Sequence, residues 1–249
     1  MKKLFAIIAI LGVFTLGMTT VAYAQDAAAA ATAGAQEGLH QALKDKFIEG
    51  GADFMSLVAI ALIFGLAFCL ERIIYLNLAE TNSTKLLKGI EDALDKGDVE
   101  AAKTIARNTR GPIASIAYQG LMRLDQGVDV VEKSIVSYGG VQAGLLEKNM
   151  SWITLFIAMA PSLGFLGTVV GMVMAFDDIQ QAGDISPTVV AGGMKVALIT
   201  TIGGLVVALI LQLFYNYLLS KLESILNKME DASISLVDMA IKYDIKFKK

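Results

Sequence analysis

Three long apolar segments constrain the fold of this chain more than any other feature of its sequence. A helix that crosses the hydrocarbon core of a bilayer needs about 20 mostly apolar residues, and three segments meet that need. Each segment is apolar on nearly every face, which disfavours helices buried in a soluble protein. We therefore predict an all-α membrane protein with three transmembrane helices, at residues 53–76, 149–176 and 188–217.

The amino-terminal end has the pattern of a secretory signal. Two lysines follow Met1, an apolar run comes next, and Ala22-Tyr23-Ala24 forms a small-x-small cleavage site. We expect residues 1–24 to be a cleaved signal peptide, with an uncleaved first span as the alternative. Residues 25–52 would then be a periplasmic tail, alanine-rich at first and amphipathic toward its end.

The positions of lysine and arginine indicate how the spans are oriented. The rule counts basic residues in the loops that flank the spans and ignores acids. Residues 177–187 contain three aspartates and no lysine or arginine, whereas residues 77–148 and 218–249 hold nearly all of the positive charge. We predict a periplasmic amino terminus, a periplasmic loop at 177–187 and a cytoplasmic carboxyl terminus.

The cytoplasmic parts have helix-forming sequences. We expect helices near 81–96, 99–109, 112–125 and 128–149, with Asp98 capping the second and Gly111-Pro112 starting the third. No proline separates the fourth helix from the second span, so a continuous helix over 128–176 is an expectation, with Gly139-Gly140 as a possible bend. The third span can likewise continue into a cytoplasmic helix at 218–249, giving long cytoplasmic helical extensions.

Small and hydroxyl-bearing residues form a stripe on each of the last two spans. At helical spacing these stripes bear one threonine near the middle of each span. One explanation is close helix packing, which small residues permit; the other is a cavity in which the hydroxyls serve as hydrogen-bonding stations. Both can hold together. The candidate residues of the proton pathway are Gly164, Thr168, Gly171, Ala197, Thr200, Thr201 and Gly204.

A proton path also needs a group that titrates near neutral pH, and threonine hydroxyls are far too weakly acidic. The interiors of the three spans contain no Asp or Glu. A titrating carboxylate must therefore come from another polypeptide. Near the span ends, Glu71 and Arg72 suit either an interfacial anchor or an intersubunit ion pair, and Lys195 suits either the lipid headgroups or a role in conduction.

Several classes of function are disfavoured by composition. The net charge of −3 and the lack of a basic stripe argue against nucleic acid. The single cysteine, Cys69, and the single histidine, His40, provide no metal cluster or disulfide. No nucleophile–base pair or phosphate loop can be assembled, so we expect neither an enzyme nor a cofactor.

Two segments resemble the signatures of a known family. LGFLGTVVGMVMAF in the second span and KVALITTIGGLVVAL in the third are similar to those of the ExbB/TolQ/MotA proton-channel proteins, ExbB most of all. The resemblance implies a ring, a pentamer of three-span subunits in the bacterial inner membrane, surrounded by membrane lipids. It also implies a dimer of single-span ExbD/TolR-like chains inside the ring and a TonB-like partner. Thr168 and Thr201 match the family's pore threonines.

The resemblance leaves one departure and several alternatives. Many members have a glutamate where this chain has Val196, beside Lys195, so the role of that glutamate does not carry over. The function implied is a motor that uses the proton-motive force to energise TonB-dependent outer-membrane transport. The alternatives are a TolQ-like motor for envelope constriction or gliding, and a membrane scaffold that conducts nothing.

Overall fold

The computed structural model describes residues 39–183 and 187–247, which are helical apart from short connections. The expected signal peptide at 1–24 and residues 25–38 of the expected tail lie outside them. No strand occurs in either described range, which confirms the all-α fold class. Helix α2, Leu39–Glu49, comes first, and the chain from Phe47 to Lys249 forms one compact unit.

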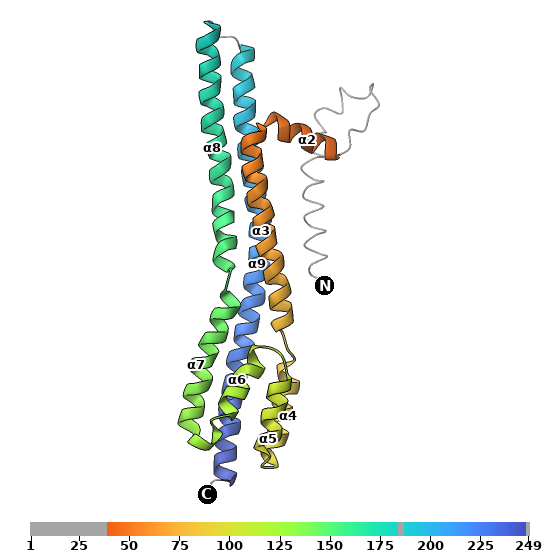
Figure 1. Ribbon diagram of the computed structural model, residues 1–249, viewed down its shortest axis with the longest axis vertical. Coiled ribbons are helices and arrows are strands. Elements are labelled where there is room, and N and C mark those ends of the chain that lie inside the picture. Colours follow the sequence, from red (N-terminus) through yellow and green to blue (C-terminus); the bar gives the residue numbers. More distant parts are fainter. Residues whose placement is uncertain (1–38, 184–186, 248–249) are drawn as a thin grey trace. The chain divides into compact units, whose positions relative to one another are not determined.

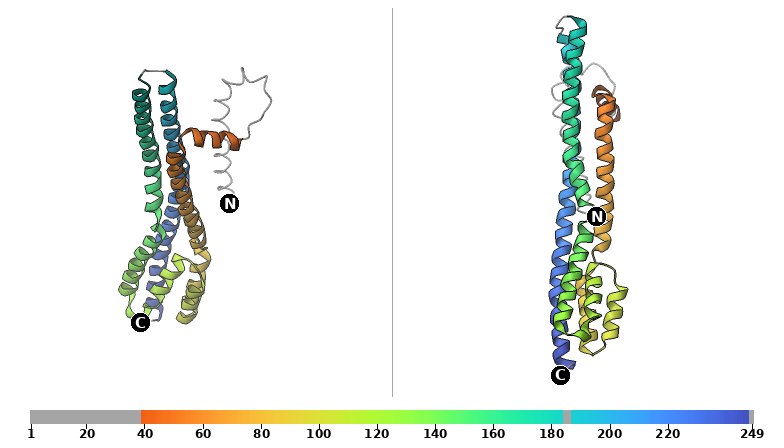
Figure 2. Two further views of the ribbon diagram at one scale, coloured as in Figure 1. Left: turned by 45° about the horizontal axis from the view of Figure 1, so that its top comes forward. Right: turned by 60° about the vertical axis from the view of Figure 1, so that its left-hand side comes forward.

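Three long helices dominate this unit and lie side by side (Figures 1 and 2). They are α3 at Ala52–Ala79, α8 at Met150–Ala182 and α9 at Pro187–Phe247. Each contains a stretch long and apolar enough to cross a membrane. Large apolar side chains such as Phe165, which is 66% exposed, face outward from α8 and α9. That arrangement suits a lipid surface, because a helix satisfies its backbone hydrogen bonds internally.

Aromatic rings and one glycine hold α3 against the other two long helices. The ring of Phe68 stacks on Trp152 and Phe156 of α8, with centroids 6.0 Å away in both cases. On the α9 side, a Cβ at Gly65 would lie 2.6 Å from Cδ1 of Leu211. The backbone of α3 therefore approaches α9 as closely as side-chain volume allows.

Shorter helices form a cluster beside the carboxyl-terminal part of α9. These are α4 at Ser83–Asp95, α5 at Val99–Asn108, α6 at Pro112–Leu121, the 3₁₀ turn η1 at Leu124–Gln126 and α7 at Val128–Glu147. Of these, α4, α6 and α7 contact α9 directly. Asp98 caps α5 by accepting a hydrogen bond from the backbone N–H of Ala101 at 2.8 Å, as expected. Asn82 caps α4 in the same way. Buried Ile90, Ile116 and Ile135 form part of the core between these helices.

The structure differs from expectation at two places. The expected continuous helix over 128–176 is wrong, because α7 ends at Glu147 and α8 begins at Met150. Gly139-Gly140 lies inside α7 without a break, so the interruption comes ten residues later than the expected bend. In addition, α8 runs to Ala182 and α9 begins at Pro187, so residues 177–182 of the expected periplasmic loop continue α8 as helix.

Candidate functional site

The small residues of α8 and α9 bring the two backbones into close contact. A Cβ at Gly204 would lie 2.5 Å from the carbonyl oxygen of Ala160, and one at Gly164 would lie 2.9 Å from that of Thr200. Real Cβ atoms do not approach backbone oxygens this closely, so both positions require glycine at this helix spacing. Close packing is therefore one role of the two stripes.

The same contact continues toward the other end of the pair. A Cβ at Gly171 would lie 3.2 Å from the backbone nitrogen of Ala197, which is itself buried. Four of the seven candidate pathway residues, Gly164, Gly171, Ala197 and Gly204, are therefore enclosed between α8 and α9 within a single chain.

Two threonines meet across this interface. The hydroxyls of Thr168 on α8 and Thr201 on α9 are hydrogen-bonded to each other. The Thr168 hydroxyl is also 3.0 Å from the carbonyl oxygen of Ala197, and the Thr201 hydroxyl is 3.3 Å from that of Gly164. Both residues are only half-buried. The structure thus brings together the two hydroxyls that the sequence analysis singled out.

The pair can be hydrogen-bonded in two directions, because each hydroxyl has one proton to donate. Thr201 can donate to Thr168 while Thr168 donates to the carbonyl of Ala197. In the reverse arrangement, Thr168 donates to Thr201 while Thr201 donates to the carbonyl of Gly164. In each direction both hydroxyl protons are used, and both oxygens keep a lone pair for a further donor. A polar station of this kind can hold a carboxyl group or water without carrying charge itself.

Thr200 has a different environment from its neighbour. Its side chain is fully buried, and its hydroxyl donates to the carbonyl of Ala197 on its own helix at 2.8 Å. Its methyl and hydroxyl groups fill the space above Gly167, where a Cβ would lie 2.8 Å from the Thr200 Cβ. Thr200 packs the helix pair rather than facing an open surface.

The walls around the threonines are apolar. Between Met150 and Phe176, and again between residues 196 and 217, the sequence has no charged side chain. Within residues 39–183 and 187–247, no group of three His, Cys, Asp or Glu side chains could hold a metal ion. The site therefore offers hydrogen bonds in an apolar setting, with no titrating group of its own.

Arg72 lies inside the chain, whereas Glu71 beside it is partly exposed. The guanidinium of Arg72 is only 2% exposed and contacts backbone carbonyls at the end of α7. Its Nε lies 3.2 Å from Oε2 of Glu71. These contacts bury the Arg72 side chain within the chain and leave Glu71 partly exposed.

Lys195 lies at the other end of the spans. Its Nζ is 2.8 Å from Oε1 of Glu49, at the end of α2. Both side chains are partly exposed, and ion pairs of this kind contribute about 0–1 kcal/mol. Six residues, about 9 Å of helix, separate Lys195 from Thr201 along α9.

Three residues that the sequence analysis did not single out matter to this geometry. Gly167 receives Thr200, and its spacing of three and four from Gly164 and Gly171 was a usable signal. Asn149 adopts a left-handed conformation between α7 and α8. Glu80 binds both Lys221 and Lys228 of α9. The roles of Asn149 and Glu80 depend on contacts between segments far apart in the sequence, which a local sequence pattern does not predict.

Comparisons with known proteins agree with the geometry. Residues 108–231, which include all of the candidate pathway residues, match the model of the MotA/TolQ/ExbB proton channel family. A putative biopolymer transport protein ExbB homolog of Methanothermobacter thermautotrophicus is 29% identical over 188 residues, 75% of this chain and 66% of that protein. The biopolymer transport protein ExbB of Neisseria gonorrhoeae is 27% identical over 65% of this chain and 79% of that protein. The chain belongs to the MotA/TolQ/ExbB proton channel family.

Proposed function

We propose that this chain is the ring-forming subunit of an inner-membrane motor that uses the proton-motive force to energise TonB-dependent outer-membrane transport. As a family member it is a multi-pass membrane protein and a transport component, not an enzyme. The observation that carries the proposal is the pair of half-buried hydroxyls, Thr168 and Thr201, that meet across two adjacent apolar helices.

The chemistry of the site calls for a partner. Hydroxyls do not titrate near neutral pH, and the uncharged stretches of α8 and α9 supply no carboxylate. A membrane aspartate from a dimer of single-span ExbD/TolR-like chains would provide the titrating group. When charged, it would accept a hydrogen bond from one threonine hydroxyl, whose proton would turn toward it from the carbonyl oxygen of Ala197 or Gly164. When protonated, it would carry no charge, so it could leave the threonine pair and move along the apolar wall at a much lower free-energy cost.

The proposed transport role draws on the relatives. Those from Methanothermobacter, Synechocystis and Neisseria bear names that describe biopolymer transport proteins. A TonB-like protein would then carry the motion of the single-span dimer to an outer-membrane transporter. The ring of subunits, a pentamer by resemblance, would surround that dimer.

The test is removal of the two hydroxyls without change of shape. Thr168→Val and Thr201→Val, alone and together, should abolish proton flux into vesicles that contain the chain and an ExbD-like partner. Thr154→Val is the matched control, because Thr154 lies on the same helix and its hydroxyl bonds only to the carbonyl of Met150, at 3.3 Å. All four variants should assemble. Full flux in the double variant would refute the proposed role of the pair.

A non-conducting scaffold is the second candidate, and the close α8–α9 packing favours it. Glycines at 164 and 204 are required by that packing whether or not protons pass. The Thr168→Val, Thr201→Val double variant separates the two candidates, because a scaffold that conducts no protons would keep its function when the hydroxyls are removed. A deletion strain separates TonB-type transport from a TolQ-like role in envelope constriction. Loss of iron-siderophore uptake would indicate the former, and defects in cell division would indicate the latter.

A further inference from the structure

The break between α7 and α8 lacks an evident cause in its own sequence. Only Lys148 and Asn149 separate the two helices, and residues 145–152 contain neither glycine nor proline. Asn149 has φ 67°, the one positive φ outside glycine in the described ranges. Sharp interruptions of helices have identifiable causes, and one of these is a side chain that inserts into the hydrogen-bond ladder.

The side chain of Arg72 on α3 reaches the carbonyl oxygens at this break. Its Nη1 lies 3.4 Å from the carbonyl oxygens of both Leu145 and Leu146, and it donates a hydrogen bond to the carbonyl of Lys148. The last carbonyls of a helix lack intrahelical donors, so the guanidinium completes the end of α7. A positive charge at a helix carboxyl terminus is also favoured by the helix dipole.

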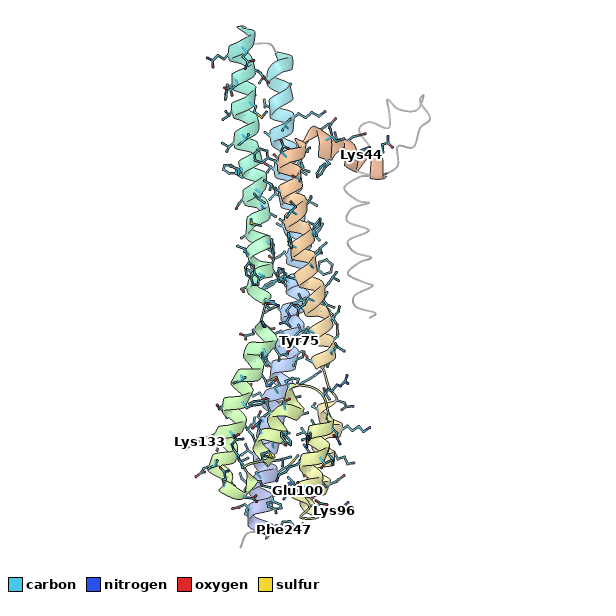
Figure 3. All side chains as sticks on the ribbon, viewed as in Figure 1. Lys44, Tyr75, Lys96, Glu100, Lys133 and Phe247 are labelled. Carbon is cyan, nitrogen blue, oxygen red and sulfur yellow. The ribbon has the colours of Figure 1, made fainter. Side chains whose placement is uncertain are left out.

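Neighbouring groups hold the guanidinium in place. It lies over the ring of Tyr75, 4.3 Å from the centroid, and Figure 3 labels Tyr75 on the end of α3 that adjoins the break. Glu71 approaches the Nε at 3.2 Å without a well-aligned hydrogen bond. Glu71 also accepts a hydrogen bond from the side chain of Asn149 at 3.3 Å. The guanidinium is therefore directed at the carbonyls, and its carboxylate neighbour reaches across to the residue that turns the chain.

We propose that Arg72 is a positioning residue: it holds α7 and α8 apart at Asn149 and thereby sets the direction in which Thr168 faces. Without the break, α7 and α8 would be one helix, and each residue of a continuous helix advances the face by about 100°. Because of the break, the rotation of α8 about its own axis is not determined by that of α7. This inference rests on the proposed function for its consequence, since a misdirected Thr168 would no longer meet Thr201 beside the partner's carboxylate.

The direct test measures the arrangement of the two helices. Spin labels at Val136→Cys on α7 and Val173→Cys on α8, which are 65% and 53% exposed, would be placed in a Cys69→Ala chain. Labelled chains would be diluted with unlabelled ones so that only distances within a chain are read. Arg72→Met preserves length but removes all donors, and we expect its label-to-label distance to shift from that of the parent. An unchanged distance in Arg72→Met would overturn the proposal.

A second pair of variants tests the proposal even if the Arg72→Met chain does not fold without its buried charge. Asn149→Ala keeps Arg72 but disfavours the left-handed conformation, whereas Asn149→Gly accepts it freely. We expect the label distance to shift in the alanine variant and to be retained in the glycine variant. Equal distances in the two would also overturn the proposal.

Proton flux then separates positioning from mere stability. Arg72→Lys retains a donor for the carbonyls, so it should recover flux that Arg72→Met loses, in step with its label distance. A shifted distance with full flux in Arg72→Met would overturn the positioning role. A parent chain that conducts no protons with its partner would refute the proposed function, while the label distances would still decide whether Arg72 makes the break.

Discussion

Single glycines determine how closely α8 and α9 approach. At Gly204 a side chain would meet the backbone oxygen of Ala160, which cannot rotate away as a side chain can. Gly204→Ala must therefore push the helices apart, and overpacking of this kind costs about 1–3 kcal/mol. We expect a lower thermal midpoint in detergent and a weakened Thr168–Thr201 contact.

A matched glycine on the same helix provides the control. Gly192→Ala places a Cβ where no atom lies within 4 Å. It should leave the thermal midpoint unchanged or raise it, because alanine is the better helix former by about 1 kcal/mol. Equal thermal midpoints for Gly204→Ala and Gly192→Ala would show that the helix pair accommodates a Cβ at position 204 without loss of stability.

At the scale of elements, Glu80 joins the end of α3 to α9. Its carboxylate binds Lys228 at 2.6 Å and also binds Lys221, and these hydrogen bonds lower the pKa of Glu80 from 4.5 to about 2. The group is ionised more readily in the folded chain, so its contribution to stability is complete above pH 4.5 and is lost as pH falls toward 2.

Glu80→Gln should remove this acid-dependent part of stability. Since the carboxylate is partly exposed, we expect a loss of about 1 kcal/mol or less at pH 7, and a smaller fall in thermal midpoint between pH 5 and pH 3 than the parent shows. Glu132→Gln, on the exposed side of α7, serves as the control. A parent-like fall in the Glu80→Gln variant would show that other groups determine the acid response.

Long apolar segments made most elements predictable from sequence, and contacts between segments decided the rest. The three apolar segments, the cap at Asp98 and the start of α6 at Pro112 follow local rules. Pro161 lies within α8 without ending it, as membrane helices allow when neighbouring groups satisfy the freed backbone. The Thr168–Thr201 pair was predictable because both stripes have helical spacing. The break at Asn149 was not, since its cause is Arg72, more than 70 residues earlier in the chain.

For the whole molecule, α9 connects the membrane-spanning part to the helices around its carboxyl end. Its 61 residues form one helix, about 90 Å long at a rise of ~1.5 Å per residue, whereas a hydrocarbon core is about 30 Å thick. The rest of α9 must extend beyond the core, where Lys242 pairs with Glu91 at 3.1 Å and Lys246 donates to the backbone of Asp95 at 2.8 Å. One continuous helix can thus transmit a displacement between the threonine site and the helices that pack on its far end.

Two single-cysteine chains decide how this chain is oriented in the membrane. In a Cys69→Ala background, Asp178→Cys lies near the end of α8 and Ser137→Cys lies on the exposed side of α7. Because lysine and arginine are absent from 177–187 and abundant in the parts around α7 and the carboxyl terminus, we expect the former outside and the latter in the cytoplasm. A membrane-impermeant maleimide should label Asp178→Cys in intact spheroplasts and Ser137→Cys only after permeabilisation. The reverse pattern would place the outer end of the proton path on the cytoplasmic side and exclude the proposed coupling to the outer membrane.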